Sequence, residues 1–186
     1  MLDVANGEVG YTGTSKYCKY GEWLGYQGGW CTTFVLWCFN KAGENLGVSM
    51  YKSIVPSGGN CNSMISWYKN RDRYHTTSSG YTPKRGDLIF FDWSGNGSSQ
   101  HVGLVDYIDG STVYTVEGNC SGKVKARKYT TSLVISRRGL NTTTSRKEGS
   151  STETSMLVSS FISLTAVCSS VSPGSICPFG NDQQPD

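Results

Sequence analysis

The sequence predicts an α+β fold in which helices come first and a small antiparallel sheet follows. Apolar residues recur at helical spacing in the first part of the chain, and short apolar runs bounded by turn residues follow from residue 83. The composition, rich in Gly, Tyr, Ser and Thr, suits strands and loops better than long helices. Helical and strand-like segments that are segregated along the chain are typical of α+β domains.

The helical part has one strong and two weaker helix signals. Residues 3–7 are expected to form a short helix, and the glycine-rich residues 10–29 a loop. A helix over residues 31–42 is expected to end at Gly43, and a second helix is expected over residues 61–70. The apolar face of the first of these helices is formed by Val35, Cys38, Phe39 and Ala42. That of the second is formed by Met64, Ile65 and Tyr68, and Asn60 is its expected N-cap.

The later part predicts a meander of strands. Pro83 to Gly86 is a turn that precedes the first strand, and Asp109-Gly110 is a hairpin signal between two strands. The strands are expected over residues 87–91, 101–108, 112–117, 123–129 and 133–137.

Composition divides the chain into a domain and a tail. Residues 1–138 are expected to form the folded domain, and residues 139–155, almost all Ser, Thr, Gly and charged, a linker. Residues 156–186 are expected to be a flexible tail to which the sequence assigns no fold. Their apolar stretch, residues 156–168, is shorter than the roughly 20 residues that a membrane helix needs.

The net charge and the N-terminal residues bear on which partners and which cellular location the protein is expected to have. The net charge of +3 over 186 residues is too small to indicate nucleic-acid binding. The segment from Met1 to Val9 lacks the basic and apolar regions of a signal peptide. Export by another route, a chain that is a fragment, and action or release from inside a cell are the alternatives that this leaves. We expect a monomer that does not span a membrane.

The cysteine pattern favours a reactive thiol over a structural metal. The chain has seven cysteines, none in C-x-x-C spacing, and only two histidines, His75 and His101. A structural zinc site is therefore not expected, and no cofactor or metal is predicted. If the other six cysteines pair within the chain, Cys31 is the natural one to stay free.

Cys31 and His101 are the candidates for nucleophile and general base. Cys31 lies where an apolar helix is expected to begin, and backbone N–H groups and the helix dipole favour a thiolate there. His101 opens an apolar strand that can hold its ring rigidly, whereas His75 lies in a polar stretch expected at the surface. The structural alternatives are a buried cysteine at the base of the helix and a histidine beside a loop.

Glu117 and Asn119 are the candidates to orient the histidine. If the strand continues through Gly118, the two side chains point to the same face and either can bond the second ring nitrogen of His101. We prefer Glu117 as the orienting residue, with Asn119 in support, and the reverse order stays open. A pair of polar residues at the end of a strand is the structural alternative.

These segments resemble the CHAP family, the cysteine- and histidine-dependent amidohydrolases and peptidases of papain-like bacterial and phage cell-wall hydrolases. The resemblance covers roughly residues 3–138, and the order and spacing of its motifs are specific. The stretches that carry it are Tyr20-Gly21-Glu22-Trp23 before Trp30-Cys31-Thr32-Thr33-Phe34-Val35, Pro83-Lys84-Arg85-Gly86-Asp87-Leu88-Ile89-Phe90-Phe91, His101-Val102-Gly103-Leu104-Val105, and Thr115-Val116-Glu117-Gly118-Asn119.

The resemblance implies a papain-like fold and hydrolysis of amide bonds in peptidoglycan at the bacterial cell wall. It implies Cys31 as nucleophile, His101 as general base, and Glu117 and Asn119 as the rest of the site. The sequence departs from the family pattern at Gly29, where many members have proline, and at the two threonines after Cys31. The sequence shows no acidic cluster near the cysteine like the calcium loop of some members. Candidates for substrate binding are Gln27 and Tyr26, beside the oxyanion, and the groove aromatics Trp30 and Trp93.

Several alternatives stay open at this stage. An N-acetylmuramoyl-L-alanine amidase and an endopeptidase would use the same residues. A phage-type endolysin, a tail-associated lysin and a bacterial remodelling or secretion-associated hydrolase all fit, and we favour a phage-type enzyme. A non-catalytic wall-binding module that retains the fold is the alternative from another class, and the tail as a targeting segment is a third.

Overall fold

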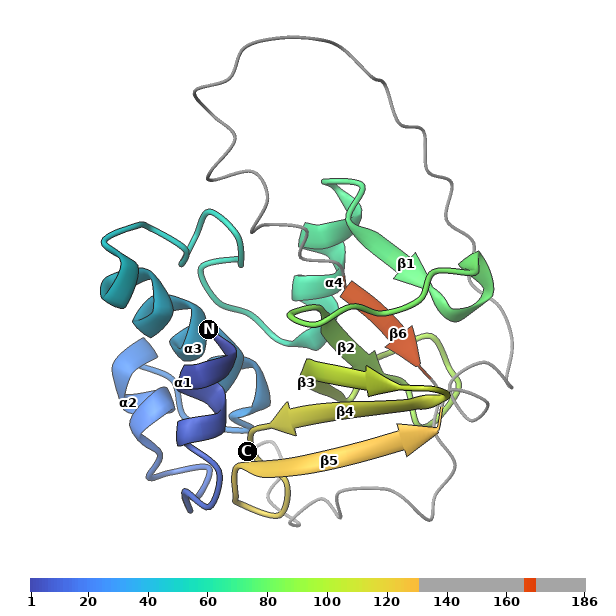
Figure 1. Cartoon of the computed structure of the whole chain (residues 1–186). Helices are drawn as coiled ribbons and strands as arrows, with labels where there is room; N and C mark the ends of the chain where they lie inside the picture. Colours follow the sequence, from blue (N-terminus) through green and yellow to red (C-terminus); the bar gives the residue numbers. More distant parts are fainter. Residues whose placement is uncertain (131–165, 170–186) are drawn as a thin grey trace, which may run out of the picture.

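The computed structural model describes residues 1–130 and the backbone of residues 166–169. It confirms the α+β class, because the helices of residues 2–46 gather on one side of the molecule and a sheet forms the other (Figure 1). The helices are α1 (Leu2–Gly7), α2 (Lys19–Leu24), α3 (Cys31–Leu46), α4 (Cys61–Lys69) and the short 3-10 helix η1 (Thr77–Ser79). The strands are β1 (Tyr74–Thr76), β2 (Leu88–Phe91), β3 (His101–Asp109), β4 (Thr112–Glu117), β5 (Lys125–Thr130) and β6 (Ala166–Ser169).

The sheet has the strand order β1-β6-β2-β3-β4-β5. Strands β2 to β5 form the predicted antiparallel meander, in which Phe91 pairs with His101 and Leu104 with Val116. β6 pairs in parallel with both β1 and β2, and it comes from the segment predicted as a tail. The strand predicted over residues 133–137 and the linker over 139–155 lie outside the described residues, so the division into domain, linker and tail stays a prediction.

Helix α3 is longer than predicted, because Gly43 does not end it. The helix continues to Leu46, and Gly47 ends it in the left-handed conformation with φ 67°. A Cβ atom on Gly43 would lie 2.5 Å from the carbonyl oxygen of Val48. Gly43 is therefore needed where the chain after the helix folds back against it, and its role is steric rather than conformational.

Helix α2 forms inside residues 10–29, which were predicted to be loop. Gly25 ends it in the left-handed conformation, so one of the glycines that indicated a loop is a helix cap. Its buried residue Tyr20 packs edge-on against Phe34 of α3 with ring centroids 5.1 Å apart. Packing of an aromatic face on α3 stabilises this short helix, which local propensity alone would not.

The segment around His75 is not the exposed stretch that was predicted. It forms β1, in which Tyr74 is buried and His75 is half-buried. The His75 ring stacks on Tyr81 with ring centroids 4.1 Å apart. His75 thus packs within the sheet region and does not line the cavity described below.

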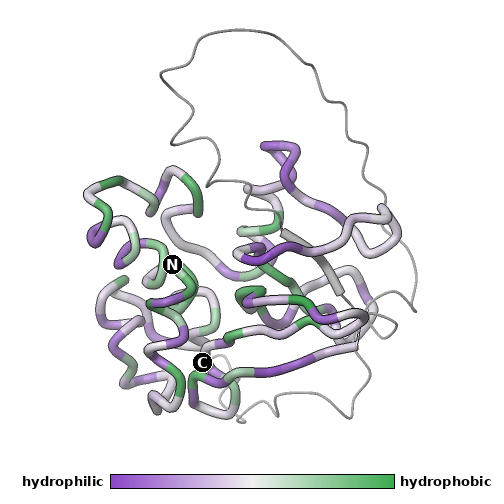
Figure 2. The backbone as a smooth tube through the Cα atoms, viewed as in Figure 1, coloured by the Kyte–Doolittle hydropathy of each residue, from purple (hydrophilic) through white to green (hydrophobic). Residues whose placement is uncertain are grey.

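The main core lies between α3 and one face of the sheet, and α3 packs on β3 and β4. Alternation along β2 divides its residues between two clusters, with Leu88 and Phe90 in the main core and Ile89 and Phe91 on the opposite face. Figure 2 shows the hydrophilic stretch along the edge strand β5, beyond the apolar central strands. No helix within residues 1–130 is long and apolar enough to cross a bilayer.

Gly118, directly after β4, lies close against Phe34 of α3, and this contact predicts a stability effect. A Cβ atom there would lie 2.5 Å from Cβ of Phe34. We expect Gly118→Ala to destabilise the fold by about 1–3 kcal/mol, as overpacking of a core does, and to lower the melting temperature by several degrees. Gly7→Ala is the matched control, because nothing lies within 4 Å of its Cβ position. Equal melting temperatures for the two variants would contradict this prediction.

Candidate functional site

Cys31 occupies the first position of α3, directly after the N-cap residue Trp30. The first backbone N–H groups of a helix have no partner within the helix, and the dipole is positive at this end. The Cys31 side chain is 8% exposed and lines a cavity of about 810 Å³. The predicted nucleophile therefore faces a space in which a substrate can bind.

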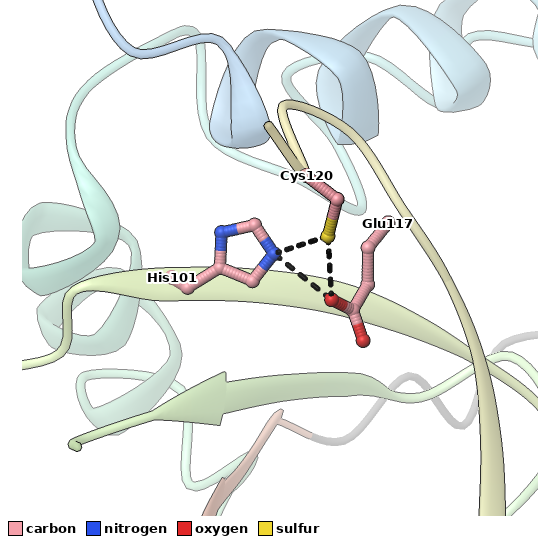
Figure 3. A group of neighbouring side chains, drawn as sticks. All are labelled: His101, Glu117 and Cys120. Carbon is pink, nitrogen blue, oxygen red and sulfur yellow. Dashed lines mark hydrogen bonds and ion pairs between the residues drawn. The ribbon is translucent and has the colours of Figure 1, made fainter. Parts of the chain in front are cut away.

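His101 is the first residue of β3 and lines the same cavity. Its Nε2 lies 3.1 Å from Oε2 of Glu117 (Figure 3). Because Glu117 bonds to that nitrogen, Nδ1 is the ring nitrogen available to the Cys31 thiol, which lies near enough to raise the pKa of His101. The thiol and the imidazole thus share one cavity, and the carboxylate lies against the imidazole, which is the set of groups that a cysteine hydrolase uses.

Glu117 is fully buried at the end of β4, and its carboxylate is held by several side chains. The Tyr129 hydroxyl donates a hydrogen bond to Oε2 at 3.1 Å, and the Thr115 hydroxyl donates one to Oε1. Gly103 of β3 makes room for the side chain, because a Cβ atom there would lie 2.6 Å from Cγ of Glu117. These contacts fix the carboxylate against the imidazole.

The surroundings of Cys31 favour its thiolate. A hydrogen bond from Cys61 is the largest cause that lowers the pKa of Cys31; burial opposes it, and His101 and the backbone N–H of Val102 lower the pKa further, well below its usual value. Burial lowers the pKa of His101, but the hydrogen bonds and charges of Cys31 and Glu117 outweigh burial and raise it to about 10. These directions favour a thiolate–imidazolium pair, in which the thiolate can attack a carbonyl and the imidazolium can protonate a leaving amine.

These pKa shifts predict a flat pH profile for alkylation of Cys31. Because the thiolate persists at neutral pH, we expect the rate of reaction with iodoacetamide to vary little between about pH 6 and pH 9, whereas an ordinary cysteine slows about tenfold per pH unit below its pKa of about 8.5. Peptide mapping by mass spectrometry measures the rate at each cysteine. Cys18 is the internal reference, because burial raises its pKa. A Cys31 rate that rises tenfold per pH unit would contradict the thiolate assignment.

Two aromatic rings pack against the His101 imidazole. Trp93 stacks on it with ring centroids 5.4 Å apart and an interplanar angle of 19°. Phe91 packs near it with centroids 5.8 Å apart. Trp93 also lines the cavity, so it contacts both the base and the space available to substrate.

The other predicted site residues divide into two groups. Asn119 and Tyr26 line the cavity with Trp93, and Tyr26 is 47% exposed at its edge. Gln27 is exposed and does not line the cavity. Trp30 is fully buried against Tyr20, because the helix that presents Cys31 to the cavity directs the preceding residue into the core.

Asn119 lines the cavity, but strand alternation does not place it there. β4 ends at Glu117, and Asn119 has a left-handed backbone with φ 60°. The bond to the ring of His101 comes from Glu117. The alternation that would have placed both side chains on one face does not extend past Gly118.

Sequence reasoning missed three residues that complete the site. Thr115 and Tyr129 hold Glu117, and Cys61 lines the cavity beside Cys31. The only sequence signal for Cys61 is that it opens a helix capped by Asn60, as Cys31 opens α3. The cap is confirmed, because the Asn60 side chain accepts a hydrogen bond from the backbone N–H of Ser63 at 2.9 Å.

One group of potential metal ligands lies within the site. Atoms of His101, Glu117 and Cys120 come within 4.8 Å of one another. The Cys120 sulfur lies 3.2 Å from Oε2 of Glu117 and 3.9 Å from Nε2 of His101 (Figure 3). That sulfur belongs to a disulfide, so it does not supply the thiolate that metal ions bind. We interpret the cluster as packing around the Glu117 carboxylate.

Comparison with known proteins identifies a family. A family model described as "CHAP domain" matches residues 21–119, more than half of the chain. The matched span contains Cys31, His101, Glu117 and Asn119. Comparisons with curated proteins and with solved structures find no match.

Proposed function

Since the chain belongs to the CHAP domain family, we propose that it hydrolyses an amide bond of bacterial peptidoglycan with Cys31 as nucleophile. The observation that carries this proposal is the buried Cys31–His101–Glu117 arrangement, whose thiol and imidazole open onto one cavity. A thiolate beside an imidazolium that a carboxylate orients is the constellation used for acyl transfer.

The reaction proceeds in two steps. The Cys31 thiolate attacks the carbonyl carbon, the C–N bond breaks, and His101 donates its proton to the departing amine. His101, now neutral, accepts a proton from water, and the resulting hydroxide attacks the thioester. The acid product leaves, and the thiolate–imidazolium pair is restored. The net reaction is amide plus water to carboxylic acid plus amine.

The negative charge that develops on the carbonyl oxygen needs donors. The backbone N–H at Cys31, at the positive end of α3, is suited to that oxygen when the carbon is bonded to Sγ. The predicted contribution of Gln27 has no support, because this side chain does not line the cavity. Asn119 is the cavity residue we assign as a second donor, through its side-chain amide.

The cavity suits a peptide-bearing polymer. Its lining combines hydroxyl and amide groups with the rings of Tyr26 and Trp93. Such walls bind peptide backbone and sugar through hydrogen bonds and flat apolar contacts. We place the site of action at the bacterial cell wall, in a lysin of the phage type that acts as a monomer.

A wall-binding module without catalysis is the competing function. An activated thiol is not needed for binding, whereas the contacts at Cys31 and Glu117 all favour a reactive thiolate and a fixed imidazole. A chain that sediments with purified walls but releases nothing from them would favour the competing function.

The bond cleaved is identified on purified peptidoglycan from several types of bacteria. We expect new amino groups and no new reducing sugar ends. New N-terminal alanine on whole stem peptides identifies an N-acetylmuramoyl-L-alanine amidase, and other new N-termini identify an endopeptidase. New reducing ends without amines would contradict the proposal, because they require cleavage between sugars.

A further inference from the structure

The loop between β2 and β3 folds around one buried carboxylate. Asp92 directly follows the last residue of β2 and is 7% exposed. Its Oδ1 accepts hydrogen bonds from the backbone N–H groups of Gly95 and Asn96, at 2.8 and 3.3 Å, and its Oδ2 accepts one from that of Gly97 at 2.7 Å. Because a buried carboxylate is stable only when donors surround it, these bonds define the shape of the loop.

The backbone of this loop needs such a fixed point. Gly95 and Gly97 both have a left-handed conformation, with φ 65° and 84°. Glycine is suited to these angles, but it also gives an unrestrained loop many other conformations. The hydrogen bonds to Asp92 favour the one conformation in which the chain leads back from β2 to the start of β3.

Gln100 ties the start of the loop to its end. Its side-chain oxygen accepts a hydrogen bond from the backbone N–H of Trp93 at 2.8 Å, and its side-chain amide donates one to the Ser94 hydroxyl at 2.9 Å. The backbone N–H of Gln100 donates to the carbonyl oxygen of Phe91 at 2.9 Å. Since Gln100 directly precedes His101, the backbone of Trp93 is fixed relative to the first residue of β3.

The fixed loop places Trp93 in a stack of rings that includes the general base. The Trp93 ring stacks on the His101 imidazole, with centroids 5.4 Å apart and an interplanar angle of 19°, and on Phe91, with centroids 5.7 Å apart and an angle of 25°. Glu117 bonds to the edge of the imidazole, at Nε2. A hydrogen bond at one ring atom leaves the tilt of the ring partly free, whereas a ring on its face opposes that tilt.

We propose that Asp92 and Trp93 are positioning residues, in which Asp92 fixes the loop so that Trp93 lies on the His101 imidazole and sets the tilt of its ring. The inference rests on the proposed function for its purpose, although the stack itself belongs to the free protein. Proton transfer at His101 requires aligned atoms within hydrogen-bond reach, so a tilted imidazole is a poorer base and acid. Neither residue takes part in the covalent steps.

Proton NMR of the folded chain without wall substrate tests the stack directly, because the chain has only two histidines. A tryptophan ring over the imidazole shields the His101 ring protons and moves their resonances upfield. On the plateau of the titration of each histidine, we expect Trp93→Leu to move the His101 resonances downfield and Trp93→Phe to retain part of the shielding. His75 stacks on Tyr81 and is the internal reference, whose resonances should not move.

Two changes in the loop test the part played by Asp92. Asp92→Asn puts an amide donor in place of one carboxylate oxygen, so at least one backbone N–H loses its acceptor. Gly97→Ala strains the loop at φ 84° while nothing lies within 4 Å of the added Cβ, so the rest of the fold is spared. Both should move the His101 resonances in the same direction as Trp93→Leu. Asp109→Asn is the matched control, because it alters an exposed carboxylate at the opposite end of β3.

The same variants should slow the reaction on purified peptidoglycan. We expect Asp92→Asn and Trp93→Leu to lower kcat by about tenfold to a hundredfold, the effect of misalignment at a reacting centre, and Asp109→Asn to leave it unchanged. A rise in KM with an unchanged kcat in Trp93→Leu would overturn the positioning role, because it would make Trp93 a substrate contact alone.

His101 resonances that stay at their parent positions in a folded Trp93→Leu variant would overturn the stack. Resonances that move in Trp93→Leu but in neither Asp92→Asn nor Gly97→Ala would remove Asp92 from the account. Because NMR needs no peptidoglycan, a parent chain that cleaves no wall but shows the expected shifts would refute the proposed function and still support the arrangement of Asp92, Trp93 and His101.

Discussion

Cys31→Ala is expected to lower the rate of amide hydrolysis by about 10³-fold or more, the loss typical of an absent nucleophile in an acyl-transfer site. The thiolate forms the bond that replaces the C–N bond, and without it His101 keeps only Glu117 as an anionic partner. Cys31 is 8% exposed and shares the cavity with the free thiol of Cys61. The residual rate therefore also measures whether Cys61 can replace it, and we expect that it cannot.

Cys31→Ser is the matched variant, because it changes one atom and retains the shape of the site. A serine hydroxyl is not ionised near neutral pH, so the site loses its thiolate nucleophile and the imidazolium keeps only Glu117 as an anionic partner. The rate should therefore fall by a similar factor. Both variants should melt close to the parent, since Cys31 borders a cavity. Hydrolysis that continues within tenfold of the parent rate in either variant would remove Cys31 from the mechanism.

The second large effect is expected from Glu117→Gln, with a fall in turnover of about 10²-fold or more. The change keeps the size of the side chain and removes the charge that holds the His101 imidazolium. Since Glu117 raises the pKa of His101, its loss lowers that pKa, and His101 then loses its proton at a lower pH. The alkaline limit of hydrolysis should therefore move to lower pH.

The pH profile separates a catalytic effect from a structural one. Glu44→Gln is the matched control, because Glu44 is an exposed carboxylate of α3 that pairs with Lys41 far from the cavity. It should leave both rate and profile unchanged. A Glu117→Gln variant that is slow, folded and unshifted in its alkaline limit would mean that Glu117 orients His101 without raising its pKa.

The parts of the fold that could be predicted are those set by local pattern. The strand boundaries of the meander follow alternation and turn residues, and they are correct to within a residue or two. Gly43 shows the limit of local reasoning: its glycine signal is real, but it marks a close approach of Val48 rather than a helix end. α2 and β1 escaped prediction because partners distant in the sequence, Phe34 for Tyr20 and the strand β6 for β1, stabilise them.

The site follows the same division. Cys31, His101 and Glu117 could be predicted because each begins or ends an element whose pattern is visible, and the structure places His101 against Glu117 and on the same cavity as Cys31. Trp30 could not be separated from the cavity aromatics, because residue type does not reveal the direction of a side chain. Cys61 lies 30 positions after Cys31 in the chain, and only the packing of α4 brings it to the cavity.

The most direct test of the central claim is partitioning of the acyl intermediate. Purified peptidoglycan is digested in rising concentrations of hydroxylamine, and the new acyl ends are identified by mass spectrometry. If Cys31 forms a thioester, hydroxylamine competes with water for it, and acyl hydroxamates should replace carboxylic acids in proportion to its concentration. Cys31→Ala should form neither product. Carboxylic acids alone at every hydroxylamine concentration, with amide hydrolysis still proceeding, would contradict a covalent mechanism through Cys31.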